Sequence, residues 1–307
     1  MRIAFLGTPE FALPSLAMLI ERRDTLAVFT QPDRPVGRKA VLTPPPVKVL
    51  AMEHGIPVYQ FEKIRSPEGV EALEAFAPDL MVTAAFGQLL SKKNLSIPKL
   101  GTINVHGSLL PKYRGASPIQ TAILEGERVT GVTTMMTDIG MDTGDILLKA
   151  ETPISETETY GELSERLSHL GADLLKETLK RLEDGTLVRT PQEEAEATTC
   201  KLLTKQDGRL SFFATRKAVH DRVRGLNPWP VATALLEEQP LKLWETSLAE
   251  DRTETASEGT LLVDGSKLFV RCSDGWLRIL SLQAAGKKRM DAASFLRGQD
   301  LCGKRLL

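Results

Sequence analysis

The sequence predicts an α/β protein in which a Rossmann-like domain is followed by a small OB-type β-barrel domain. The chain opens with a strand, a turn and a helix, which is the order that begins a Rossmann-type unit. Its last third carries five short strand-like segments separated by Gly and Asp turns, as small barrels or sandwiches do, and of these we expect an OB-type barrel. A polar, acidic stretch between these parts is typical of a linker. We therefore predict a first domain at residues 1–189, a linker at 190–206 and a second domain at 207–307.

The composition is that of an ordinary globular protein: 307 residues, of which 42% are hydrophobic and 26% charged. The formal net charge is −1, so no overall field indicates a nucleic-acid partner. The three cysteines form no Cys-x-x-Cys pair, which argues against a disulfide framework or a zinc ribbon and fits a reducing cytosol. The first residues lack the apolar core of a signal peptide, and no apolar run reaches the ~20 residues of a membrane span. We expect a cytoplasmic monomer that does not enter a membrane.

Strands and helices alternate in the first part of the chain, and their predicted ranges are 2–6 (strand), 9–20 (helix), 26–30 (strand), 47–54 (helix), 58–59 (strand), 66–76 (helix) and 80–84 (strand). The first turn holds one glycine, Gly7, instead of Gly-x-Gly-x-x-Gly, so a dinucleotide such as NAD is not expected. The last of these strands is apolar except for Thr83, which predicts a central strand buried on both faces. Phe86, Gly87 and Gln88 follow its carboxyl end.

Residues 31–48 are predicted to be a long loop. They contain five prolines and four charged side chains that draw attention: Asp33, Arg34, Arg38 and Lys39. A loop of about 15 residues in a compact domain is long enough to suggest a function. The alternative is a solvated excursion that its prolines stiffen.

A short strand that begins near residue 101 ends beside two polar side chains. Asn104 and His106 are two residues apart, so they project from one face near the carboxyl end of the strand, where open α/β sheets bind ligands. An amide that donates to an oxyanion, beside an imidazole that moves a proton, suits attack on a carbonyl carbon. The alternative is that both are ordinary strand-end residues that satisfy nearby backbone.

A turn rich in Gly and Asp, residues 138–145, connects two predicted strands at 129–136 and 146–149, as in a hairpin. Asp142 lies at its tip, either as a reactive carboxylate or as the residue of an Asx-turn. The next helix, predicted at 160–182, is amphipathic, and we expect the leucines of one stripe to be buried. These leucines are Leu163, Leu167, Leu170, Leu174 and Leu182.

The last part of the chain begins with a predicted helix at 211–226. Five short strands follow, at 232–236, 241–246, 259–263, 267–272 and 276–283. A small basic cluster, Lys287, Lys288 and Arg289, precedes a last helical piece at 290–297.

Of the four histidines, only His106 stands at a strand end beside another reactive polar group. His169 and His220 lie beside the apolar stripes of predicted helices, which favours surface positions. No cluster of His, Cys or Asp has the spacing of metal ligands, and no Gly-x-Ser-x-Gly elbow marks Ser108 as a nucleophile. The pattern favours direct acyl transfer without a metal or a covalent intermediate.

These residues resemble the folate-dependent formyltransferase family. The resemblance rests on Asn104-x-His106, on the Gly-Ser-Leu-Leu-Pro-Lys-Tyr-Arg-Gly run that follows, and on Asp142. It covers nearly the whole chain, because three further stretches are similar to the members of that family that formylate methionyl initiator tRNA: 29–38, 227–230 and 283–290.

The resemblance implies 10-formyltetrahydrofolate as formyl donor and the α-amino group of methionyl initiator tRNA as acceptor. It implies a catalytic first domain and a tRNA-binding second domain, with no metal. Asn104 would bind the formyl oxygen, His106 would carry the proton, and Asp142 would orient His106 and favour its charged form. The folate would lie against two segments: Phe86, Gly87 and Gln88, and Ser108, Leu109, Leu110 and Pro111. The tRNA would contact five basic side chains: Arg38, Lys39, Lys287, Lys288 and Arg289.

Two other functions fit parts of the sequence. A formyltransferase that acts on glycinamide ribonucleotide or a sugar nucleotide would share the catalytic trio, but the 31–48 loop and the barrel argue against it. A non-catalytic OB-type nucleic-acid-binding protein would share the barrel, but the intact Asn104, His106 and Asp142 argue against it.

Overall fold

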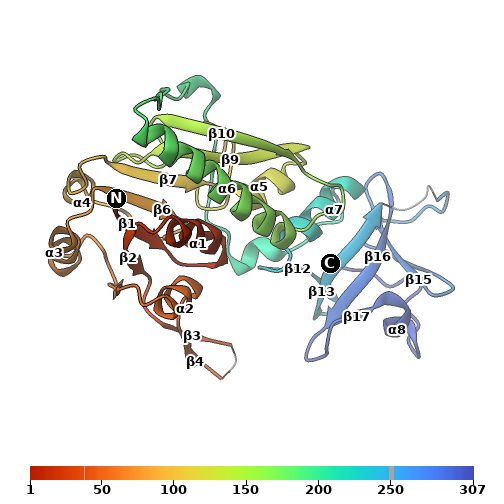
Figure 1. The fold of residues 1–307 in the computed structure, drawn as a ribbon. Helices are drawn as coiled ribbons and strands as arrows, with labels where there is room; N and C mark the ends of the chain where they lie inside the picture. Colours follow the sequence, from red (N-terminus) through yellow and green to blue (C-terminus); the bar gives the residue numbers. More distant parts are fainter. Residues whose placement is uncertain (38, 249–251) are drawn as a thin grey trace. The chain divides into compact units, whose positions relative to one another are not determined.

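The computed structural model of the protein describes residues 1–37, 39–248 and 252–307 (Figure 1). The chain folds into two compact units. Unit 1 comprises residues 1–115, 130–152 and 164–199, and unit 2 comprises residues 116–129, 153–163 and 200–307. The chain therefore crosses between the units several times, which the sequence did not indicate.

Unit 1 is built on a seven-stranded sheet in the order β10-β9-β7-β6-β1-β2-β5. The strands are β1 (Arg2–Gly7), β2 (Thr25–Thr30), β5 (Val58–Gln60), β6 (Leu80–Ala84), β7 (Thr102–His106), β9 (Val129–Met136) and β10 (Ile146–Pro153). The five strands from β7 to β5 run parallel, and β9 is antiparallel to β7. The parallel-dominated, Rossmann-like sheet is thus confirmed. Strand β6 is buried along its whole length and central, as predicted.

Helices pack on both faces of this sheet, and the elements are η1 (Glu10–Ala12), α1 (Leu13–Glu21), α2 (Pro46–Glu53), α3 (Pro67–Phe76), α4 (Lys92–Ser96) and most of α6 (Tyr160–Glu183). On one face, Leu73 of α3 shares a buried cluster with Leu6 and Met81 of the sheet. On the other face, Gly171 of α6 lies so close to β7 that an added Cβ would stand 2.8 Å from a methyl group of Val105. The glycine therefore lets α6 approach the strand that carries Asn104 and His106 on its opposite face.

The buried stripe of α6 differs from the predicted one. Leu163 and Leu167 are buried as predicted, whereas Leu170, Leu174 and Leu182 are only half-buried. The stripe continues through positions four residues apart, Gly171, Leu175 and Leu179. A spacing of four slightly exceeds one helical turn, so the stripe winds around the helix and leaves the other leucines at its margin.

Residues 31–48 are not a loop throughout, and the prediction was wrong for their middle part. β3 (Arg34–Val36) and β4 (Val41–Thr43) pair as an antiparallel hairpin. All residues of both strands are exposed. Because neither strand has a buried face, the sequence lacks the alternation of apolar and polar residues by which a half-buried strand is predicted. At the base of the hairpin, Lys48 Nζ donates to Asp33 Oδ2 over 2.9 Å.

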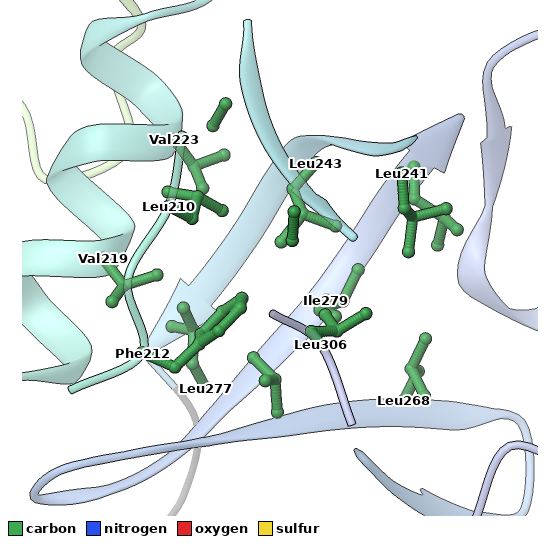
Figure 2. Close-up of a cluster of buried hydrophobic side chains, with 14 of the residues drawn as sticks. Leu210, Phe212, Val219, Val223, Leu241, Leu243, Leu268, Leu277, Ile279 and Leu306 are labelled. Atoms are coloured by element: carbon green, nitrogen blue, oxygen red, sulfur yellow. The ribbon is translucent and has the colours of Figure 1, made fainter. Parts of the chain in front are cut away.

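Unit 2 carries an antiparallel sheet in the order β12-β13-β16-β15-β14, with β17 paired to β16. The strands are β12 (Ala232–Leu236), β13 (Gln239–Leu248), β14 (Leu261–Asp264), β15 (Lys267–Cys272), β16 (Gly275–Ala284) and β17 (Met290–Asp291). All five predicted strands are present, and the antiparallel C-terminal sheet is confirmed. Its buried core combines these strands with Val219 and Val223 of a helix (Figure 2).

The helices of unit 2 are α5 (Pro118–Leu124), α7 (Arg216–Gly225) and α8 (Ala292–Leu296). α7 begins five residues later than predicted, because the side chain of Thr215 accepts a hydrogen bond from the Ala218 N–H and caps the helix there. Short elements complete the chain: β8 (Arg114–Gly115), η2 (Glu194–Glu196), β11 (Thr199–Cys200) and η3 (Lys205–Gly208). Within the described ranges, no helix is long and apolar enough to cross a membrane.

His220 is buried in α7, so its predicted surface position was wrong. Its Nε2–H donates to the Glu156 carbonyl over 2.9 Å, and its Nδ1 lies 2.9 Å from Thr246 Oγ1. Partners distant in the chain thus form hydrogen bonds with both ring nitrogens, which offsets the cost of removing the polar ring from water. Burial lowers the pKa of His220 below its ordinary value.

Candidate active site

Two adjacent parallel strands hold the first candidate residue. Asn104 of β7 stands opposite Thr83 of β6, and the Thr83 hydroxyl donates to Asn104 Oδ1 over 2.8 Å. The amide oxygen of Asn104 is therefore occupied by a hydrogen bond from the neighbouring strand. The amide nitrogen is then the atom of Asn104 that can meet an oxyanion.

His106 ends β7 on the same face as Asn104, and it is 5% exposed. Its Nε2 lies 3.0 Å from the carbonyl oxygen of Tyr113. A carbonyl only accepts, so Nε2 carries the proton of the neutral ring and Nδ1 holds the lone pair. Nδ1 faces Asp142 Oδ2 at 3.7 Å, which is longer than a hydrogen bond.

Asp142 lies in the turn between β9 and β10, as predicted, with a left-handed φ of 54°. Its Oδ2 accepts a 2.8 Å hydrogen bond from the Gly115 N–H. The Asx-turn role belongs to a different residue of the turn, since Asp138 Oδ1 accepts from the Gly140 N–H over 3.0 Å. The Asp142 carboxylate thus points to the His106 loop and not to its own turn.

The segment expected to line a folate pocket, residues 108–111, begins directly after β7. Ser108 is fully buried, and its hydroxyl donates to the Lys112 carbonyl over 2.7 Å. The Thr133 hydroxyl donates to the Ser108 carbonyl over 2.7 Å and accepts from the Leu110 N–H over 3.1 Å. Leu110 and Pro111 are buried, while Leu109 is half-buried. The segment is therefore a rigid wall held by strand β9.

The second expected folate segment follows β6. Phe86 is buried, and its carbonyl accepts from the Thr8 hydroxyl over 3.0 Å. Gly87, with a φ of 77°, has a carbonyl that accepts from Gln31 Nε2 over 3.1 Å. The Gln88 side chain holds the chain before α3, because its Nε2 donates to the Phe61 carbonyl over 2.8 Å. The Gln88 side-chain amide is thus engaged within the protein, since its Oε1 also accepts from the Ile64 N–H over 2.5 Å.

The five residues expected to contact tRNA are distributed over both units. Arg38 lies outside the described residues, and Lys39 is exposed in the turn between β3 and β4. Lys287 and Lys288 are exposed in unit 2. Arg289 forms an ion pair with Glu245 and stacks on Trp244, with 5.2 Å from its guanidinium carbon to the ring centroid.

Sequence reasoning missed several groups that hold the site. Thr83 looked like an ordinary strand residue, and the carbonyl of Tyr113 carries no sequence signal at all. Tyr113 and Ala85, which follows β6, also have left-handed backbones, with φ of 60° and 46°. Strained non-glycine residues of this kind cluster at functional sites.

Across the ranges that the structure describes, no group of three His, Cys, Asp or Glu side chains could hold a metal ion.

Comparisons with known proteins identify the family of the chain. Residues 1–179 match the family model described as formyl transferase, and residues 202–300 match the formyl transferase C-terminal domain. Methionyl-tRNA formyltransferase of Ruminiclostridium cellulolyticum is 48% identical over 98% of this chain and 97% of its own. The protein of that name from Citrifermentans bemidjiense is 49% identical, over 98% of this chain and 94% of its own.

Two solved structures share the fold at lower identity. The sugar 3N-formyl transferase WlaRD, in the presence of dTDP and 5-N-formyl-THF, has a TM-score of 0.70 at 19% identity, covering 94% of this chain and 99% of its own. HypX from Aquifex aeolicus, in complex with tetrahydrofolic acid, has a TM-score of 0.67 at 18% identity, covering 99% of this chain and 50% of its own. From these matches, the chain belongs to the formyl transferase family and, within it, to the group named methionyl-tRNA formyltransferase.

Proposed function

We propose that this protein transfers the formyl group of 10-formyltetrahydrofolate to the α-amino group of methionyl initiator tRNA. The observation that carries the proposal is 48% identity with a protein named methionyl-tRNA formyltransferase over 98% of the chain. In the reaction, the amine nitrogen forms a bond to the formyl carbon, and the bond from that carbon to N10 of the folate breaks. A proton moves from the amine to N10, which yields N-formylmethionyl-tRNA and tetrahydrofolate.

Asn104 is the proposed oxyanion donor. The Thr83 hydroxyl holds its Oδ1, so its Nδ2–H groups keep one orientation before the substrate arrives. A preorganised donor of this kind contributes about 3–4 kcal/mol to transition-state stabilisation.

His106 is the proposed proton carrier, and its Nδ1 is the proposed basic atom. The Tyr113 carbonyl holds the proton on Nε2, which keeps the lone pair on the side of Asp142. When Nδ1 takes the amine proton, the ring becomes an imidazolium beside the Asp142 carboxylate. A contraction of less than about 1 Å brings these groups to the length of a charge-assisted hydrogen bond. Transfer of that proton to N10 then restores the neutral ring.

The folate is proposed to lie against the backbone of residues 86–88 and 108–111. Phe86 and Leu110 are buried behind these walls, and hydrogen bonds with Thr8 and Thr133 fix the backbone. Flat apolar walls with fixed backbone groups suit a pterin ring.

The tRNA is proposed to contact Arg38, Lys39 of the hairpin turn and the basic cluster at 287–289. An Arg binds phosphate bidentately or reads a base edge, and exposed lysines add charge neutralisation. In a binding titration, replacing both Lys287 and Lys288 by Ala should reduce the salt slope by roughly 2, because each phosphate contact contributes about 0.9. An unchanged slope would remove these lysines from the interface.

The C-terminal sheet is proposed to be an OB-type barrel. Support comes from the last residues of the chain, which bond to both edge strands. Leu306 bridges Leu236 of β12, and Arg305 bridges Thr260, directly before β14. The domain division at 189 and 207, a monomeric state and a cytoplasmic location are proposed with it, and sedimentation of the purified chain tests the monomer.

Formyl transfer itself is tested with the purified full chain, 10-formyltetrahydrofolate and methionyl initiator tRNA. Base hydrolysis of the tRNA ester releases the methionine, and the expected product is N-formylmethionine. Uncharged tRNA is the control for the amine. Formylation of an amino sugar nucleotide, without any formylation of the charged tRNA, would reject the proposal.

A further inference from the structure

A short acidic segment contacts both loops of the candidate active site. Residues 192–198 lie between the two regions that match the family models, which end at 179 and begin at 202. The sequence predicts a weakly structured linker at 190–206; in the structure, residues 194–196 form a 3₁₀ turn and the segment makes contacts within unit 1. These contacts converge on the groups that hold His106 and Asp142.

The side chain of Gln192 holds the turn that carries Asp142. Its Nε2 donates to the Asp142 carbonyl over 2.7 Å and to the Gly144 carbonyl over 2.8 Å. Its Oε1 accepts from Arg114 Nε over 3.0 Å. The amide therefore ties two loops together, and each of its polar atoms takes part.

The other end of the segment holds the loop that carries Tyr113. Thr198 Oγ1 accepts from the Tyr113 N–H over 2.9 Å, and the Thr198 carbonyl accepts from the Arg114 N–H over 2.9 Å. The buried Arg114 guanidinium returns to the segment, since its Nη1 donates to both Glu194 carboxylate oxygens over 3.0 Å. The Tyr113 carbonyl, in turn, is the partner of His106 Nε2.

We infer that residues 192–198 form a strap that positions the His106 ring and the Asp142 carboxylate for proton transfer, with Gln192 as its main positioning residue. The inference rests on the proposed function. The strap bonds to the backbone of Tyr113 and Asp142, and both residues have left-handed backbones. Such strained conformations persist only where contacts with the surrounding structure hold them in place. The strap supplies those surroundings from a distant part of the chain, at least about 50 residues away from either loop.

The test compares Gln192→Ala with a matched control, Glu193→Gln, in the full chain. Glu193 is the next residue of the strap and is exposed. Since a displacement of 1 Å costs up to about 10²-fold in rate, kcat should fall about tenfold or more in Gln192→Ala. KM for both substrates should change less than about twofold, because the change removes no substrate contact. Glu193→Gln should keep the native kcat.

A double-variant cycle separates positioning from loss of structure. If Gln192 acts through Asp142, the pair Gln192→Ala with Asp142→Asn should be no slower than Asp142→Asn alone. Additive losses, or a native kcat in Gln192→Ala, would overturn the strap. A native chain that forms no product would reject the proposed function instead, before any variant is compared.

Two further variants cover the case in which Gln192→Ala does not fold. Gln192→Glu keeps the acceptor for Arg114 but sets an oxygen against two carbonyl oxygens. Thr198→Ala removes one hydroxyl from an exposed position at the far end of the strap. Lower kcat with an unchanged KM and thermal midpoint in either variant supports the strap, and a native kcat in both contradicts it.

Discussion

Replacing Asp142 by Asn removes one charge beside His106 and leaves the shape of the side chain nearly unchanged. Asp142 Oδ2 lies 3.7 Å from His106 Nδ1. Two unit charges about 4 Å apart interact by about 4 kcal/mol at an effective dielectric constant of about 20. The Asp142 side chain is 20% exposed, and solvent and desolvation reduce the net effect to roughly 2–3 kcal/mol. Loss of that stabilisation of the imidazolium should lower kcat about 10²-fold.

The assay is single-turnover formyl transfer with saturating folate and methionyl initiator tRNA, so that the chemical step is observed without product release. Asp138→Asn is the matched control, because it removes the same charge from the same turn. Asp138 accepts its hydrogen bonds from Gly140 and Thr143 within that turn. If both variants lose rate equally, or if Asp142→Asn keeps the native rate, the charge of Asp142 does not act on His106 and the reasoning fails.

Three other predictions concern the two units separately. Thr83→Val removes the hydroxyl that orients Asn104, and kcat should fall about fivefold, as expected for one lost hydrogen bond of about 1 kcal/mol; a variant as fast as the native chain in single-turnover assays would exclude this role. Burial lowers the pKa of His220 below 6.5, so the unfolded chain binds more protons between the lowered pKa and 6.5. The free energy of unfolding, from urea titrations, should therefore fall as the pH drops through that window, and a slope that His220→Gln leaves unaltered would argue against it. Burial raises the pKa of Cys272 to about 12, whereas Cys302 is exposed. Mass spectrometry after alkylation at pH 8 should find Cys302 modified and Cys272 protected until denaturant is added, and early modification of Cys272 would contradict its burial.

Local pattern was enough for most of the regular elements. Strand β6 was predicted with its observed bounds because a run that is apolar except for Thr83 suits a strand buried on both faces. Strand β7 placed Asn104 and His106 on one face through its period of two. The hairpin β3–β4 was missed, since its strands bury neither face.

Only part of the candidate site could be predicted from the sequence. Its reactive residue types could be named, but the orientation of each one depends on a partner far along the chain. Thr83 orients Asn104 from 21 residues away, and Gln192 holds the backbone of Asp142 from 50 residues away. A local sequence pattern cannot predict such a pair of partners, because hydrogen bonds between loops depend on how the whole sheet brings strand ends together.

The sequence by itself determined the class of fold, the central strands and the residue types that suit formyl transfer. These follow from periodicity, turn composition and the chemistry of side chains, which are properties of short segments. The tertiary structure alone decided that the Nε2 proton of His106 meets a carbonyl, that Asp142 faces its Nδ1, and that an acidic segment binds both loops. Only the packed chain sets those distances, since each joins groups that the sequence keeps apart.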